Sequence, residues 1–159
     1  MKHALLVALA LMTGTASAAD SIVGRWKLTD YTMKWMDTGE VTHPRGQDAL
    51  GYLEYSPNGH MSVIITSNKL PRAAGKTYTD AEAAFIFNNS TAFAGTYKVQ
   101  GNKYVAHADV STVPDLLGVD LGRTFEINGD KLTITTNQTS ISTSDGRPAS
   151  ITSIWQRIE

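Results

Sequence analysis

Gly24-Arg25-Trp26-Lys27-Leu28 lies near the start of the first long strand-like stretch of this chain, which covers residues 22–36. Trp26 and Leu28 alternate with charged residues, as expected for a strand that packs one face against a core. Farther along the stretch neither face is cleanly apolar. This change predicts a long strand that bends, with the side that faces the core changing part-way along it.

Turn signals at regular intervals divide much of the remaining chain into further strands. Asn-Gly or Asp-Gly pairs separate most of the alternating runs, and they supply the positive φ that tight hairpin turns need. With the first stretch, the expected strands are 22–36, 49–56, 60–67, 94–100, 103–111, 121–127, 131–137 and 149–158. The sequence therefore predicts an all-β fold, an eight-stranded antiparallel up-and-down barrel, because closure removes the exposed sheet edges.

Residues 68–93 interrupt this pattern between the third and fourth predicted strands. Thr79-Asp80-Ala81-Glu82 fits a capping box, and apolar residues follow at helical spacing, so we expect a short helix near 80–88. A segment of this length within a compact barrel often covers a binding mouth. We interpret it as a lid whose apolar side chains are Phe85, Phe87 and Phe93.

The N-terminus predicts export. Met1-Lys2-His3 is positively charged, an apolar run too short to span a bilayer follows, and Ala16-Ser17-Ala18 fits a cleavage site. We expect residues 1–18 to be a signal peptide, and residues 19–159 to form one domain in the periplasm or outside the cell. Because the chain has no cysteine, this domain is held together by its core without disulfides.

Composition and motifs argue against several function classes. A net charge of −1 without a basic run disfavours nucleic acid as a partner, and no second apolar segment predicts stable membrane insertion after cleavage. The histidines that remain are His43, His60 and His107, which together make no recognisable zinc-ligand set. No nucleophile elbow or glycine-rich phosphate loop occurs either, so we predict neither a metal nor a cofactor.

Arg123 is the most informative charged residue, because the alternation that turns Phe125 and Ile127 toward the core also carries Arg123 inward. A guanidinium keeps its proton, and its burial without a partner is costly. Arg123 should therefore meet a carboxylate, backbone carbonyls or an acidic ligand. His107, on the preceding strand, points inward or outward depending on which face of that strand lines the interior.

Taken together, these motifs resemble the lipocalin-like domain family, small calycin-type β-barrels of bacteria and fungi. The resemblance extends over nearly all of residues 19–159 and rests on segments 24–28, 43–46, 51–62, 94–97, 107–111, 122–125 and 129–132. It implies a closed barrel with a cavity, in which Gly24 and Trp26 form a floor and Arg157 stacks across Trp26. His60, His107 and Arg123 fall at positions that the family pattern features.

Three functions remain open, of which we favour the first. In that hypothesis the exported barrel binds a small, largely apolar or amphipathic molecule, and the candidate contacts are Arg123, His107, Tyr55, Tyr97, Phe93, Phe85 and Met61. In the second, the protein is a cofactor-independent isomerase or cyclase. His107 or His60 would be its general acid or base beside Arg123, which requires His107 and Arg123 to converge in one cleft. In the third, the protein is a structural or interaction module of the cell envelope whose barrel is packed solid.

Overall fold

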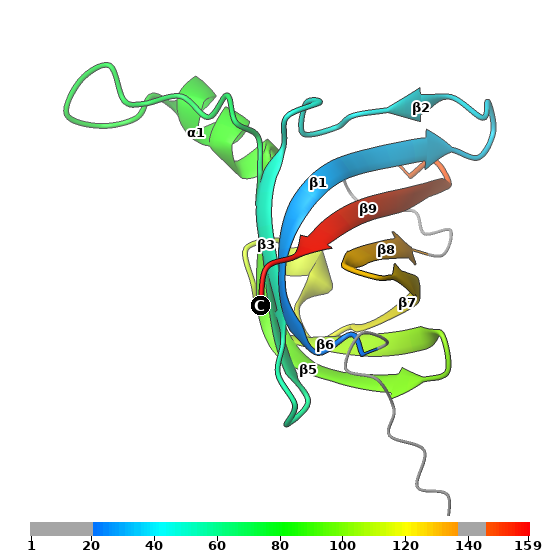
Figure 1. The fold of residues 1–159 in the computed structure, drawn as a ribbon. Coiled ribbons are helices and arrows are strands. Elements are labelled where there is room, and N and C mark those ends of the chain that lie inside the picture. Colours follow the sequence, from blue (N-terminus) through cyan, green and yellow to red (C-terminus); the bar gives the residue numbers. More distant parts are fainter. Residues whose placement is uncertain (1–20, 137–145) are drawn as a thin grey trace, which may run out of the picture.

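The computed structural model describes residues 21–136 and 146–159, and nine strands of this part form one antiparallel sheet (Figure 1). Each barrel strand pairs with its neighbour in sequence, and β1 also pairs with β9, which closes the sheet. The predicted all-β antiparallel barrel of eight strands is therefore confirmed. The strands are β1 (Gly24–Trp35), β2 (Val41–Thr42), β3 (Leu50–Tyr55), β4 (His60–Thr66), β5 (Ser90–Gln100), β6 (Lys103–Ser111), β7 (Asp120–Asn128), β8 (Lys131–Thr136) and β9 (Ala149–Arg157).

The ninth strand, β2, was not predicted. It is two residues long and pairs only with the C-terminal part of β1, outside the closed barrel. Because β2 precedes β3, the helix α1 (Asp80–Asn88) follows the fourth strand of the observed order. The predicted position between strands three and four is thus not confirmed.

The helix α1 begins at the predicted capping box. The Thr79 hydroxyl accepts the Glu82 backbone N–H, and the Glu82 carboxylate accepts the Thr79 backbone N–H at 2.8 Å. None of the α1 residues is buried, and the helix projects outward from the barrel (Figure 1). A second short element, the 3-10 turn η2 (Pro114–Leu116), connects β6 to β7.

The strand β1 changes its inward face at a bulge, as the broken alternation predicted. Its pairing register with β9 shifts between Leu28 and Asp30. Before the shift Trp26 and Leu28 are buried, and after it Met33 is buried and Tyr31 lines the interior. The bulge therefore lets one strand supply both the floor of the barrel and a polar group higher in its wall.

Trp26 closes one end of the barrel and is fully buried. The Arg157 guanidinium lies over the indole ring, 4.0 Å from its centroid, and donates to the carbonyl oxygens of Ser21 and Val23 at 2.8 and 2.9 Å. Gly24 has a φ of +136°, and a Cβ atom there would lie 2.7 Å from Arg157 Nη1. Only glycine fits this position without displacing the guanidinium.

The proposed signal peptide, residues 1–18, lies outside the described residues, as does Asn137 at the end of the seventh predicted strand. Within residues 21–136 and 146–159, no helix is both long and apolar enough to cross a membrane.

Candidate functional site

A cavity of about 660 Å³ lies inside the barrel, on the side of Leu53 and Trp155 away from the Trp26 floor. This volume is within the range of about 300–1,000 Å³ that is usual for small-molecule sites. The third hypothesis required a barrel that is packed solid, and this cavity contradicts it. One wall is apolar and comes from β3, β4 and β5, which contribute Leu53, Met61, Val63, Ile65 and Phe93.

Polar side chains are concentrated on the strands across the cavity. Tyr31 comes from β1, Arg123 from β7, Thr136 from β8 and Ser153 from β9, interspersed with aliphatic residues. The Ser153 hydroxyl accepts the Trp155 indole N–H at 2.8 Å, so its own proton remains available to donate. The cavity thus combines an apolar wall with a wall rich in hydrogen-bond donors.

Arg123 lines the cavity because it shares the inner face of β7 with Leu121 and Phe125, which pack in or against the core. Its guanidinium donates to the Gly122 carbonyl oxygen at 2.8 Å. It forms no ion pair with a carboxylate of the described residues. A backbone carbonyl is one of the partners that the sequence predicts for Arg123, but it does not provide a counter-ion for the positive charge of the guanidinium.

Arg45 is a second cavity arginine, and it is only 6% exposed. It extends from the loop after β2, donates to the Asn88 carbonyl oxygen at the end of α1, and donates to Thr91 Oγ1 at 3.0 Å. Its Nε is buried without a hydrogen-bond partner, and no carboxylate in residues 21–136 or 146–159 forms an ion pair with it. Burial lowers the pKa of Arg45, but a guanidinium remains charged in proteins.

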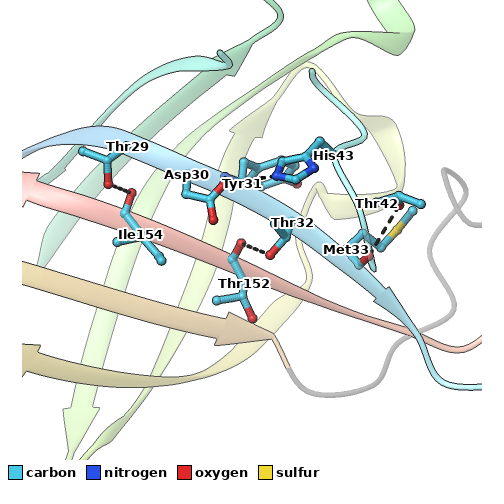
Figure 2. Close-up of polar contacts among 9 residues, drawn as sticks. All are labelled: Thr29, Asp30, Tyr31, Thr32, Met33, Thr42, His43, Thr152 and Ile154. Carbon is cyan, nitrogen blue, oxygen red and sulfur yellow. Dashed lines mark hydrogen bonds and ion pairs between the residues drawn. The ribbon is translucent and has the colours of Figure 1, made fainter. Parts of the chain in front are cut away.

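The Tyr31 side chain is within electrostatic reach of both guanidiniums. Burial raises the pKa of Tyr31, and the charges of Arg45 and Arg123 act in the opposite direction. Asp30, the neighbouring acid, accepts the Tyr31 backbone N–H at 2.9 Å and lies 3.5 Å from His43 Nε2 (Figure 2). Asp30 is therefore engaged outside the cavity, while the neutral Tyr31 hydroxyl can donate into it.

Tyrosines also form the base of the cavity. Tyr104 lines it and packs edge-to-face on Tyr55, with ring centroids 5.5 Å apart, and Tyr55 packs on Tyr97 at 4.8 Å. The Tyr97 hydroxyl donates to the Ser56 carbonyl oxygen at 2.8 Å. Burial raises the pKa of Tyr55 well above its ordinary value and also raises the pKa of Tyr104. Both hydroxyls are therefore neutral at physiological pH.

Apart from His107, which is on the outer face of β6, the predicted ligand contacts separate into three groups. Arg123, Met61 and Phe93 line the cavity. Tyr55 and Tyr97 are buried but lie beneath it, among the aromatic residues of the core. Phe85 is 43% exposed on α1 and is not part of the lining.

The expected lid is not formed by α1. Of the three apolar residues predicted for the lid, Phe85 and Phe87 are exposed to solvent on α1, which contributes no residue to the cavity lining. The third, Phe93, belongs to the barrel strand β5 and lines the cavity from there. The segment between β6 and β7 lies at the mouth instead, and it contributes Val113, Asp115, Leu116 and Val119. Sequence reasoning missed these residues because a short loop between two strands has no periodic signal.

His107 lies on the outer face of β6, since Ala106 and Ala108 on either side of it are buried. Its Nδ1 is 2.7 Å from Asp120 Oδ1, and its Nε2 is 3.8 Å from Asp109 Oδ1. Arg123 points inward, so the two side chains are on opposite sides of the barrel wall. The convergence of His107 and Arg123 that the enzyme hypothesis required is therefore wrong.

The remaining predicted residue, His60, is exposed at the start of β4, where its backbone N–H and carbonyl oxygen both bond to the Ser56 hydroxyl. In the part of the chain that the structure describes, no group of three or more metal-ligating side chains is close enough to hold a metal ion.

The family comparison agrees with this architecture. A family model described as a lipocalin-like domain matches residues 23–158, which include every strand of the barrel. No curated protein matches the chain at a significant level. Because the family model matches residues 23–158 and the structure is a closed eight-stranded barrel, the chain belongs to the lipocalin-like domain family.

Proposed function

We propose that this protein binds a small, largely apolar or amphipathic molecule inside the barrel. The observation that supports this most strongly is the cavity of about 660 Å³ with its apolar wall on β3, β4 and β5. Small-molecule sites are mostly apolar and have a few placed polar groups, which matches this lining. Removing the apolar part of a ligand from water supplies the driving force, about 25 cal/mol for each Å² buried.

The proposal includes an exported protein. The charged start, the short apolar run and the cleavage pattern in residues 1–18 support delivery to the periplasm or the outside of the cell. The isomerase or cyclase alternative has weaker support, because His107 and His60 both lie outside the cavity.

A pair of adjacent substitutions in β4 tests the proposal. Val63 faces the cavity, whereas Ile64 is on the outer face and 49% exposed. Val63→Trp should fill the cavity, and Ile64→Trp adds the same side chain outside it. The probe is N-phenyl-1-naphthylamine, a neutral apolar dye whose fluorescence increases in apolar surroundings, titrated into each folded protein.

The wild type and Ile64→Trp should show saturable binding of the dye, and Val63→Trp should bind it at least about tenfold more weakly, a loss of about 1.4 kcal/mol. Circular dichroism confirms that all three proteins are folded. If the wild type does not bind the dye, or if both tryptophan variants bind it equally well, the cavity is not a ligand site.

A further inference from the structure

We infer that the ligand of this cavity is an amphipathic acid, whose carboxylate head is held by Arg45 and Arg123 with the help of the Tyr31 hydroxyl. The inference rests on the proposed function and specifies the chemical class of its ligand. It follows from three features of the lining: its charge, its hydrogen-bonding groups and the position of its apolar wall.

The first feature is a positive charge without a counter-ion. Arg45 and Arg123 both line the cavity, and neither forms an ion pair with a carboxylate of the described residues. Two acids, Asp115 and Asp120, lie at the mouth, but both are exposed, and Asp120 is bound to His107 on the outer face. Arg45 is only 6% exposed, and Arg123 is partly buried. A buried charge is costly unless it is paired, so a neutral ligand would leave the cost at Arg45 in place and an anion would reduce it.

The second feature is the kind of hydrogen-bonding group that faces the ligand. Arg45 is oriented by its bonds to the Asn88 carbonyl oxygen and to Thr91 Oγ1, and Nη1 and Nη2 each carry a second N–H beyond these bonds. Tyr31 is kept neutral by burial, so its hydroxyl has a proton to donate. The guanidinium groups of Arg45 and Arg123 only donate hydrogen bonds, and an ionised carboxylate only accepts them, so the two are complementary. Hydrogen bonds to a charged group are also among the strongest in proteins.

The third feature is the separation of polar and apolar surface. Arg123 and Tyr31 come from β7 and β1, and Arg45 reaches only the start of β5, where it bonds to Thr91. The apolar wall comes from β3, β4 and β5 and consists of Leu53, Met61, Val63, Ile65 and Phe93. A molecule with an acidic head and an alkyl or cyclic body can satisfy both surfaces at once. An inorganic anion would leave the apolar wall unused, and an alcohol of the same shape would leave the arginines unpaired.

Competition against the neutral dye tests the inference with ligands that differ only in the head group. Dodecanoate, dodecanol and dodecylamine displace N-phenyl-1-naphthylamine in parallel titrations, each below its aggregation concentration. Dodecanoate should compete at about 10- to 100-fold lower concentration than dodecanol, which is the difference expected for hydrogen bonds to a charged group. Dodecylamine should be the weakest competitor because its head group is cationic.

Substitutions then assign the preference to the two arginines. The preference for the acid is measured as the ratio of the dodecanol concentration to the dodecanoate concentration that displaces half of the dye. Arg123→Met and Arg45→Met should each reduce this ratio by about tenfold or more, and Tyr31→Phe should reduce it by a smaller factor. Arg72→Met is the control, because it removes one positive charge from an exposed residue outside the cavity lining and should leave the ratio unchanged. If Arg45→Met does not fold, Arg123→Met and Tyr31→Phe decide the result.

The outcomes separate the inference from the function beneath it. If the dye binds and Val63→Trp blocks it, but dodecanoate and dodecanol compete equally, the amphipathic-acid inference is overturned and the proposed function stands. The same holds if Arg123→Met keeps the full preference for the acid. If the wild type binds no dye, both are overturned.

Discussion

Replacing Arg157 by methionine should lower the free energy of unfolding by about 2–4 kcal/mol without weakening ligand binding. The guanidinium lies 4.0 Å from the centroid of the Trp26 ring, a contact worth about 0.5–2 kcal/mol. It also donates to the carbonyl oxygens of Ser21 and Val23, and each hydrogen bond from a charged group contributes about 1.5–3 kcal/mol. Relief from burying the charge offsets part of this sum, and methionine retains some packing on Trp26.

Urea denaturation followed by far-ultraviolet circular dichroism measures the change, and dye titration of the folded variant measures binding. Arg25→Met is the matched control at the same end of the barrel. Arg25 is half exposed and forms a surface ion pair with Glu159 at 3.6 Å, so its loss should cost less than about 1 kcal/mol. The account of a structural floor separate from the binding site is refuted if Arg157→Met is as stable as the wild type. It is equally refuted if the folded variant no longer binds the dye.

Three further predictions follow from burial and geometry. Burial raises the pKa of Tyr55, so its stabilising contribution is full below about pH 10, where the unfolded chain ionises, and is lost as the pH rises toward the folded pKa. Between pH 9 and pH 11 the urea midpoint of Tyr55→Phe should therefore fall by less than that of the wild type. An equal fall in both proteins would contradict the raised pKa of Tyr55. Gly95→Ala would place a Cβ atom 1.9 Å from the His107 carbonyl oxygen. The thermal midpoint should therefore drop by an amount that corresponds to roughly 3 kcal/mol or more. Native-like stability of this variant would contradict the close approach of β5 and β6 at Gly95. Thr79→Ala removes the N-terminal cap of α1, so hydrogen exchange of the α1 amides should become faster by a factor that corresponds to about 1 kcal/mol. The affinity for the dye should stay constant, because α1 contributes no residue to the cavity lining. A weaker affinity would mean that α1 contributes to the binding site.

The barrel could be predicted from the sequence because its signals are local. Tight turns such as Pro57-Asn58-Gly59 and Asn128-Gly129-Asp130 separate alternating runs, and the observed hairpins are β3–β4 and β7–β8. The broken alternation in residues 22–36 likewise predicted a change of inward face, and the register shift between Leu28 and Asp30 produces it. The short β2 was missed because two residues carry no alternation.

Much of the site depends on tertiary contacts that no local pattern encodes. Alternation placed Arg123 on the inner face of its strand, where the structure has it. Arg45, in contrast, is buried through contacts with Asn88 and Thr91, more than forty residues away, so it looked like an ordinary loop residue. The sequence left the orientation of His107 open, and the structure places it on the outer face of β6, between the buried Ala106 and Ala108.

Methyl-detected nuclear Overhauser effects between bound dodecanoate and the protein test the central claim most directly, because they report where the ligand lies. The account predicts contacts from the alkyl chain to the methyl groups of Leu53, Val63 and Ile65, which line the cavity, and none to Ile64 on the outer face of the same strand. Contacts confined to Ile64 and to Ile86 of α1 would contradict it, because the ligand would then lie on the outside of a barrel whose interior is not its binding site.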